Sequence, residues 1–201
     1  PAEVRGRVTM LDKGDQPGDD VGQAVLWLSG PPSQSRPPVQ AEIGTSKKEF
    51  SPHVLVVPVG STVSFPTHDP FNHNVFSLSE ENPFDLGLYG RDEVRSVRFA
   101  QPGVVRVYCN VHAQMSALVL VRDNPYFAKA AKDGSFRIEG VPAGEYKVRA
   151  FHERAGDGAV VTVKVAATGD SAPLALSLDA ESYKRVPHKN KFGKNYGREA
   201  Y

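Results

Sequence analysis

The sequence has one cysteine in 201 residues, so no disulfide can form within the chain. It has no apolar run of the roughly 18 residues that a membrane-spanning helix needs. The net charge of +1 at pH 7 gives no general reason to expect nucleic acid as a partner. Glycine-rich phosphate loops, zinc-binding cysteine pairs and an ordered serine–histidine–aspartate set are also missing. Because these residue sets of common enzyme classes are absent, we expect a protein that is not an enzyme.

Hydrophobic residues make up 40% of the chain, and 18 glycines and 16 prolines separate short apolar runs. Alternating or β-branched segments predict strands at 3–9, 24–28, 94–99, 104–109, 117–122, 136–138, 145–151, 160–165 and 174–178. Residues 80–93 are polar with scattered apolar groups, which predicts an irregular excursion at a sheet edge. No segment predicts a helix longer than a turn or two. The expected fold class is therefore all-β.

The sequence Asp-Asn-Pro at 123–125 predicts a break between domains. We expect a first domain over residues 1–123, a smaller second domain over 126–179 and an extended basic tail over 180–201. With only about 55 residues, the second domain would have a small core, and we expect it to pack against the first domain for stability.

The end of the chain is basic, whereas the rest is mildly acidic. Residues 181–201 have a net charge of +4, which leaves −3 for the remainder of a chain whose total is +1. The six basic residues are Lys184, Arg185, Lys189, Lys191, Lys194 and Arg198, against Glu181 and Glu199. Such a tail is typical of an interaction segment for an acidic partner or a larger complex. A solvated end without a partner fits the pattern equally well.

The most informative stretch is residues 108–115, which read Tyr-Cys-Asn-Val-His-Ala-Gln-Met. Cys109, His112 and Met115 follow one another at intervals of three residues, directly after a valine-rich strand. A thiolate, two imidazoles and a weak axial thioether form the ligand set of blue-copper sites. This loop supplies three of those four ligands, and His73 is the best candidate for the fourth.

Some alternatives stay open. A glutamine can replace the axial methionine in such sites, so Gln114 is an alternative to Met115, although Met115 is preferred. His68 lies five residues before His73 and is an alternative or additional ligand, but a plain loop histidine is the simpler interpretation. Cys109 shares a strand face with two valines, so its side chain is expected to point inward. The other histidines, His53, His152 and His188, are expected to be surface or structural groups.

The segments around these residues resemble the cupredoxins. The resemblance rests on His-Asn-Val at 73–75, on Pro-Val-Gly-Ser-Thr-Val-Ser-Phe at 58–65 and on the ligand loop, which is most similar to that of amicyanin. Asp-Gly-Ser-Phe-Arg-Ile at 133–138 and Val-Pro-Ala-Gly-Glu-Tyr at 141–146 resemble the carboxypeptidase-regulatory-like, transthyretin-like sandwich. This order of domains is similar to periplasmic proteins of the methylamine-utilisation or plastocyanin-like type.

The resemblance implies a Greek-key cupredoxin sandwich over 1–123, followed by a small Ig-like or transthyretin-like β-sandwich. It also implies one mononuclear type 1 copper ion, with His73, Cys109 and His112 as strong ligands and Met115 as the weak axial ligand. Such a protein carries single electrons between redox partners. A redox protein is expected to dock near His112.

The resemblance further implies features around the ligands. Asn74 is expected to brace the ligand loop by a hydrogen bond. The exposed edge of His112, ringed by Val111 and Ala113, is expected to be the electron port. A periplasmic location follows as well, and because the chain begins at Pro1 rather than at a methionine, we expect that a targeting segment has been removed.

Two other functions remain possible from the sequence. One is a non-redox accessory or scaffold subunit of a larger complex, which the second domain and basic tail favour because a freely diffusing carrier needs neither. The other is a copper enzyme with an open coordination position. That function needs a carboxylate or water in place of Met115, and the sequence offers no obvious one.

Overall fold

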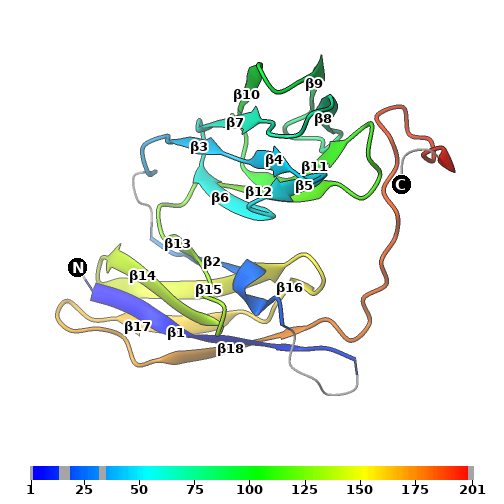
Figure 1. The fold of residues 1–201 in the computed structure, drawn as a ribbon. Coiled ribbons are helices and arrows are strands. Elements are labelled where there is room, and N and C mark those ends of the chain that lie inside the picture. The colour runs from blue at the N-terminus through cyan, green and yellow to red at the C-terminus, as the bar shows by residue number, and fades with distance from the viewer. Residues whose placement is uncertain (1, 14–18, 32–34, 199–201) are drawn as a thin grey trace. The chain divides into compact units, whose positions relative to one another are not determined.

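The computed structural model describes residues 2–13, 19–31 and 35–198, and their regular secondary structure is almost entirely β-strand (Figure 1). The one helical element with described bounds is a 3-10 turn, η1 (Val21–Gln23). The predicted all-β fold class is confirmed. None of the described helical segments has the length and apolar character needed to cross a lipid bilayer.

The chain divides into two compact units that do not follow the order of the sequence. Unit 1 combines residues 1–34 with 124–185, and unit 2 combines residues 35–123 with 186–201. The predicted first domain over 1–123 is therefore wrong at its N-terminal end, although the predicted break near residue 124 coincides with a unit boundary. The predicted separate tail is also wrong, because its last part belongs to unit 2.

Unit 1 is a sandwich of two sheets. The first has the order β14–β1–β18, and the second has the order β13–β2–β15–β16, with β17 also paired with β15. The strands of the first sheet are β1 (Ala2–Leu11), β14 (Ser135–Val141) and β18 (Leu174–Asp179). Those of the second are β2 (Val25–Ser29), β13 (Phe127–Lys129), β15 (Gly144–His152), β16 (Gly156–Asp157) and β17 (Val161–Val165).

The N-terminal strands belong to unit 1 because their apolar faces complete its core. Val4 and Val8 of β1 and Leu26 and Leu28 of β2 are buried in one cluster with residues of β14, β15 and β18. β1 is the central strand of its sheet, antiparallel to β14 and parallel to β18. The predicted domain over 126–179 is thus incomplete without the first strands of the chain. Its carboxypeptidase-regulatory-like identity stays a prediction.

Unit 2 is built from a three-stranded and a five-stranded sheet and a short hairpin. The orders are β10–β7–β3 and β6–β12–β11–β8–β9, and β4 pairs with β5. The strands of the three-stranded sheet and the hairpin are β3 (Gln40–Glu42), β4 (Gly44–Ser46), β5 (Glu49–Ser51), β7 (Thr62–Pro66) and β10 (Val94–Arg98). Those of the five-stranded sheet are β6 (Val54–Pro58), β8 (His73–Ser77), β9 (Phe84–Tyr89), β11 (Gly103–Cys109) and β12 (Ser116–Arg122).

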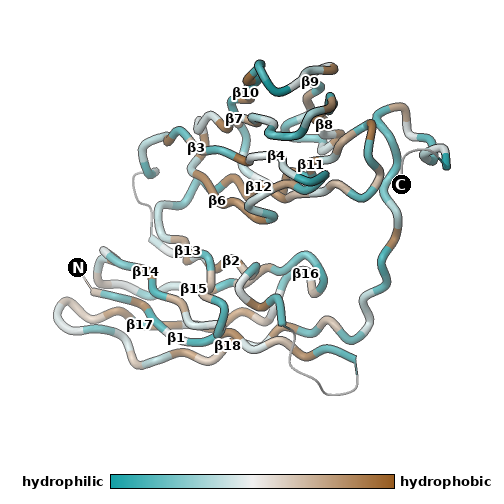
Figure 2. Tube along the Cα trace, viewed as in Figure 1, coloured by the Kyte–Doolittle hydropathy of each residue, from teal (hydrophilic) through white to brown (hydrophobic). Residues whose placement is uncertain are grey.

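The core of unit 2 is formed by side chains of both sheets. Val63 and Phe65 of β7 are buried with Val105 and Val107 of β11. Residues 117–121 of β12 are buried in succession, as expected for a strand that is covered on both faces. Figure 2 shows the corresponding concentration of apolar residues along β6 and β12.

Most predicted strands are confirmed within a few residues, but the predicted irregular excursion over 80–93 is wrong. It contains β9, an edge strand paired with β8. Gly87 has a φ of +70 and lies where the pairing of β9 with β8 shifts its register, so this strand is irregular. The buried Tyr89 hydroxyl, which donates to the Phe65 carbonyl oxygen at 2.6 Å, holds the end of β9.

Gly6 of β1 lies so close to β18 that a side chain there would collide with the backbone. A Cβ atom at Gly6 would lie 2.2 Å from the Leu174 carbonyl oxygen. We predict that Gly6→Ala lowers the free energy of unfolding of unit 1 by about 1–3 kcal/mol through overpacking. Thermal unfolding followed by fluorescence of Trp27, the single tryptophan, measures the effect. Gly197→Ala, where a Cβ atom meets nothing within 4 Å, is the control; an unchanged midpoint for Gly6→Ala would contradict the prediction.

Candidate metal centre

Cys109 is the last residue of β11, and strand alternation turns its thiol into the core. Val105, Val107 and Cys109 are buried, whereas Arg106 between the valines is exposed. The predicted inward direction of the thiol is confirmed.

The segment 110–115 folds back on itself through main-chain hydrogen bonds. The Met115 amide donates to the His112 carbonyl oxygen at 3.2 Å, and the Cys109 amide donates to the Met115 carbonyl oxygen at 3.4 Å. β12 then runs antiparallel to β11. This closed loop returns His112 to the side of Cys109.

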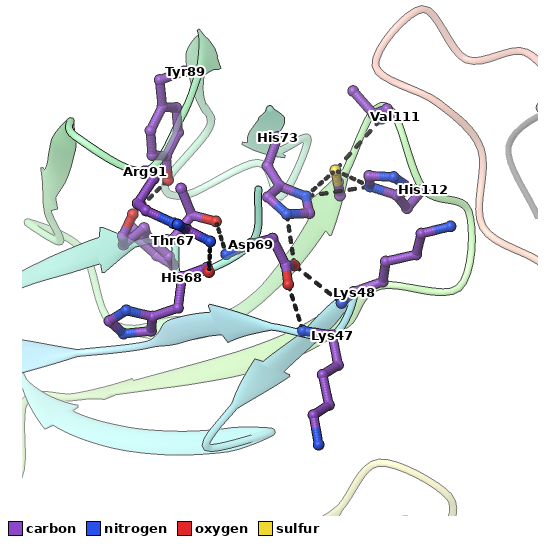
Figure 3. A network of polar contacts seen from close by, with 12 residues as sticks. Lys47, Lys48, Thr67, His68, Asp69, His73, Tyr89, Arg91, Val111 and His112 are labelled. Carbon is purple, nitrogen blue, oxygen red and sulfur yellow. Dashed lines mark hydrogen bonds and ion pairs between the residues drawn. The ribbon is translucent and has the colours of Figure 1, made fainter. Parts of the chain in front are cut away.

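His73 is the first residue of β8 and comes to the same place from the neighbouring strand. Its Nδ1 atom lies 3.6 Å from Cys109 Sγ and 3.2 Å from His112 Nδ1, and the sulfur lies 3.8 Å from His112 Nδ1. Figure 3 shows dashed contacts joining both rings to the sulfur. The structure therefore brings together the three predicted strong ligands in a group that can hold a metal ion.

The distances between the donor atoms fit a single ion. Metal–nitrogen bonds of about 2.0 Å and metal–sulfur bonds of about 2.3 Å around one ion in a plane separate the donors by about 3.5–3.8 Å. The observed separations of 3.2, 3.6 and 3.8 Å are close to these values. A thiolate with two imidazoles is a soft donor set that suits copper and excludes calcium or magnesium.

Asp69 determines which nitrogen of His73 faces this cluster. Its Oδ2 atom lies 3.0 Å from His73 Nε2, and His73 is 0% and Asp69 5% exposed. Because an ionised carboxylate only accepts hydrogen bonds, Nε2 carries the proton and Nδ1 keeps its lone pair. His73 is thereby set as a metal ligand through Nδ1.

The same carboxylate holds the turn between β4 and β5. Lys47 and Lys48 have φ values of +54 and +59, a left-handed conformation that is uncommon outside glycine. Their amides donate to the two carboxylate oxygens of Asp69 at 2.6 and 3.1 Å. Figure 3 shows the carboxylate between this turn and His73. The turn and the ligand thus share one acceptor group.

Burial controls the protonation of the imidazoles. It lowers the pKa of His73 against the opposing effect of the Asp69 hydrogen bond and charge. Burial also lowers the pKa of His112, with a further contribution from His73. For Asp69, burial alone would raise the pKa, but hydrogen bonds from the turn amides and the His73 ring hold it below its ordinary value. At neutral pH the imidazoles are uncharged, which is the state that binds metal.

The main chain beside the sulfur is fixed by two further bonds. The Val111 amide donates to Cys109 Sγ at 3.4 Å. The Asn110 amide donates to the Asn74 carbonyl oxygen at 2.8 Å. The predicted brace from Asn74 is confirmed, but it comes from the main chain, because the Asn74 side chain donates instead to Asp85 at 2.7 Å.

The two candidates for the axial ligand differ in burial. Met115 is 1% exposed and belongs to the same apolar cluster as Cys109. Gln114 is exposed. Burial therefore favours Met115, whose role as a ligand stays a prediction.

The structure does not bring His68 into the donor group. His68 is exposed, and Figure 3 shows its ring pointing away from His73. The remaining histidines have other contacts: His53 Nδ1 with the Ser116 carbonyl oxygen, His152 Nε2 with the Asp20 carbonyl oxygen and the His188 ring with Tyr108. The His152 contact agrees with its predicted structural role. His53 and His188, which the sequence predicts to be surface groups, are half-buried.

Phe71 is a site residue that sequence reasoning missed. Its ring centre lies 5.3 Å from the ring centres of both His73 and His112. Phe71 and Val111 are each 37% exposed, whereas Ala113 is only 8% exposed. The exposed apolar residues beside His112 are therefore Phe71 and Val111, and the prediction for Ala113 is wrong because its side chain is buried.

Asp69 is the second missed residue, and a sequence signal for it exists. Metal-binding histidines usually donate their other ring N–H to a carboxylate or carbonyl oxygen. An aspartate four residues before a candidate ligand is therefore a reasonable second partner.

No protein-family model and no curated protein matches this chain. Among solved structures, it is similar to a purple cupredoxin from Nitrosopumilus maritimus, with 26% identity, 41% of this chain and 99% of that chain covered, and a TM-score of 0.36. A copper-containing nitrite reductase from Thermus scotoductus has 21% identity and a TM-score of 0.40, over 57% of this chain but 28% of the reductase. An oxidised amicyanin variant has 17% identity and a TM-score of 0.39, over 48% of this chain and 99% of the amicyanin chain. At such TM-scores these likenesses do not assign a family.

We predict that Asp69→Ala weakens metal binding about 10–100-fold, because the His73 ring and the turn lose their shared acceptor. Competition with a chelator measures the affinity. Asp69→Asn keeps one acceptor oxygen and should lose less of the metal affinity than Asp69→Ala. Asp92→Ala, which removes an exposed acid, is the matched control. Wild-type affinity in Asp69→Ala would show that the carboxylate does not position the ligand.

Proposed function

We propose that unit 2 is a type 1 copper domain that carries single electrons and binds one copper ion. The observation that carries the proposal is the cluster of Cys109 Sγ with the Nδ1 atoms of His73 and His112, at pairwise distances of 3.2 to 3.8 Å. A thiolate and two imidazoles suit copper in both oxidation states. Met115 is the weak axial ligand in this proposal, in preference to the exposed Gln114.

Copper, when bound, supplies the one-electron couple between Cu(II) and Cu(I). The chain's own residues hold the donors in place in both states. Asp69 orients His73, and the Asn74 carbonyl oxygen restrains the loop beside Cys109. Among the described residues, no carboxylate belongs to the donor group. This arrangement supports an electron carrier rather than an enzyme.

The redox partner is proposed to dock over Phe71 and Val111 beside His112. These two residues are exposed and apolar, and the Phe71 ring lies against His112. The Lys48 ammonium lies 5.8 Å from the centre of the Phe71 ring and adds positive charge to the patch. A partner with an apolar centre and an acidic rim fits this surface.

A periplasmic location is part of the proposal. A free thiol is at risk in an oxidising compartment, but a metal ligand is protected by its metal. The buried position of Cys109 adds to this protection. The resemblance to exported cupredoxins supports the same location.

The first test is the visible spectrum of the metal-free protein after addition of Cu(II). We predict an intense thiolate-to-copper band at one copper per chain, because the sulfur lies within reach of both imidazoles. Cys109→Ser and His73→Ala should remove the band. His68→Ala should keep it, because His68 is exposed and outside the donor group. A wild-type protein without the band would contradict the type 1 site.

The docking surface has a separate test. We predict that Val111→Glu slows electron self-exchange of the copper protein about tenfold, because the carboxylate would have to lose its water within the apolar contact between two approaching copies. Line broadening in NMR spectra of partly oxidised samples measures the rate. The visible band should stay unchanged. Val160→Glu, at a 45% exposed residue of unit 1, is the control; equal rates in the two variants would exclude Val111 from the port.

A second candidate function is a non-redox accessory subunit that binds an anionic partner through unit 1. Four basic residues, Arg5, Arg7, Lys129 and Arg137, line a cavity of about 640 Å³ there. Arg5 and Arg137 are direct cross-strand partners, and like charges in such positions destabilise a sheet. Glu3 offsets part of this repulsion through its ion pair with Arg137 at 3.1 Å, and a bound anionic group would offset more of it. A wild-type chain without a copper band would leave this candidate as the better one.

A further inference from the structure

Residues 186–198, here called the strap, belong to unit 2 and lie beside its metal-binding loop (Figure 1). The Tyr196 hydroxyl donates to the Cys109 carbonyl oxygen at 2.7 Å. The Lys191 amide donates to the Asn110 side-chain oxygen at 3.0 Å. The strap therefore bonds directly to a candidate ligand residue and to its neighbour, without touching a donor atom.

The bond from Tyr196 completes the fixation of one peptide group. In the peptide between Cys109 and Asn110, the oxygen accepts from Tyr196 and the N–H donates to Asn74 at 2.8 Å. Because a peptide group is planar, holding both polar ends fixes its rotation. The next amide, that of Val111, donates to the sulfur at 3.4 Å. The orientation of this peptide thus controls a hydrogen bond to the thiolate.

Aromatic contacts hold Tyr196 in place for this bond. The His188 ring stacks on Tyr108, with 3.8 Å between ring centres and 13° between planes. Tyr196 meets His188 edge-on, with ring centres 5.2 Å apart. Since Tyr108 directly precedes Cys109, the strap contacts three consecutive residues of the chain, at 108, 109 and 110.

An ion pair connects the strap to the strands next to the site. Lys191 Nζ lies 2.7 Å from Asp85 Oδ2. The other oxygen of Asp85 accepts from the Asn74 side chain at 2.7 Å and from the Gly87 amide at 2.9 Å. Asp85 therefore joins the strap to the residue that braces the ligand loop.

These contacts differ from those of a tail that merely adds to the core. The large apolar residues of the strap, Val186 and Phe192, are 80% and 70% exposed. The strap contributes little apolar burial, and its directional contacts concentrate on residues 108–110. This distribution indicates positioning of the loop rather than general stabilisation.

We infer that the strap positions Cys109 as a metal ligand and that Tyr196 is its positioning residue. The inference rests on the proposed copper function, because its consequence is an effect on the copper–sulfur bond. Without the Tyr196 hydroxyl, the peptide after Cys109 is free to rotate, and the Val111 amide loses its alignment with the sulfur. The metal is then held less firmly, although the fold is unchanged.

The test is Tyr196→Phe in the full chain loaded with Cu(II). The expected result is release of copper to a chelator about tenfold faster than from the wild type, with a shifted or weakened thiolate band. The unfolding midpoint of the metal-free protein should stay unchanged. Tyr183→Phe makes the same chemical change in unit 1 and should behave as the wild type. Wild-type release and an unshifted band in Tyr196→Phe would overturn the inference.

A metal-free measurement separates this inference from the copper proposal. Hydrogen exchange at the Asn110 and Val111 amides should be about tenfold faster in Tyr196→Phe than in the wild type or Tyr183→Phe. If the wild type shows no copper band, the copper function fails, and faster exchange still supports positioning of the loop by the strap. Equal exchange rates in all three proteins would overturn the inference that the strap positions the loop.

Discussion

The metal centre depends on the carboxylate of Asp69. It accepts hydrogen bonds from the amides of Lys47 and Lys48 and from the ring of His73. The two amides belong to a turn in a conformation that most residues avoid, and such strain persists only where the surroundings hold it. The ring bond leaves Nδ1 of His73 as a lone-pair donor toward Cys109. One buried charge therefore maintains both a strained turn and the direction of a ligand.

The sheet of unit 2 places the strands that carry His73 and Cys109 side by side, and the Asp69 carboxylate then fixes the orientation of the His73 ring. β8 and β11 are neighbours in the five-stranded sheet, and Cys109 pairs with Val75. That register brings His73 and the thiol to the same end of adjacent strands. Only His112 depends on the loop, which its own main-chain bonds close. In the copper carrier that we propose, donors held in this way by a ladder would have little freedom to move between oxidation states, which would favour fast electron transfer.

The parts predicted from the sequence are those that local pattern determines. Alternation in β11 predicts the inward thiol, and the spacing from Cys109 to His112 lies within one loop. The wrong domain boundaries concern pairings between distant segments, such as β1 with β18, where Gly6 lies opposite Leu174. Alternation shows which face of a strand is apolar but not which sheet buries it. Asp69 lies only four residues before His73, but the turn that it also holds, at Lys47 and Lys48, is distant in the sequence.

The basic tail illustrates how charge and geometry carry different information. A cluster of positive charge attracts any acidic group, so the sequence could not distinguish a partner on the same chain from one on another. Directional bonds make that distinction, because the Tyr196 hydroxyl and the Lys191 amide each reach a single acceptor in the ligand loop. The strap therefore occupies the side of the loop at residues 108–110. The apolar side at Phe71 and Val111 remains exposed, which leaves the side of His112 open for the redox partner that we propose.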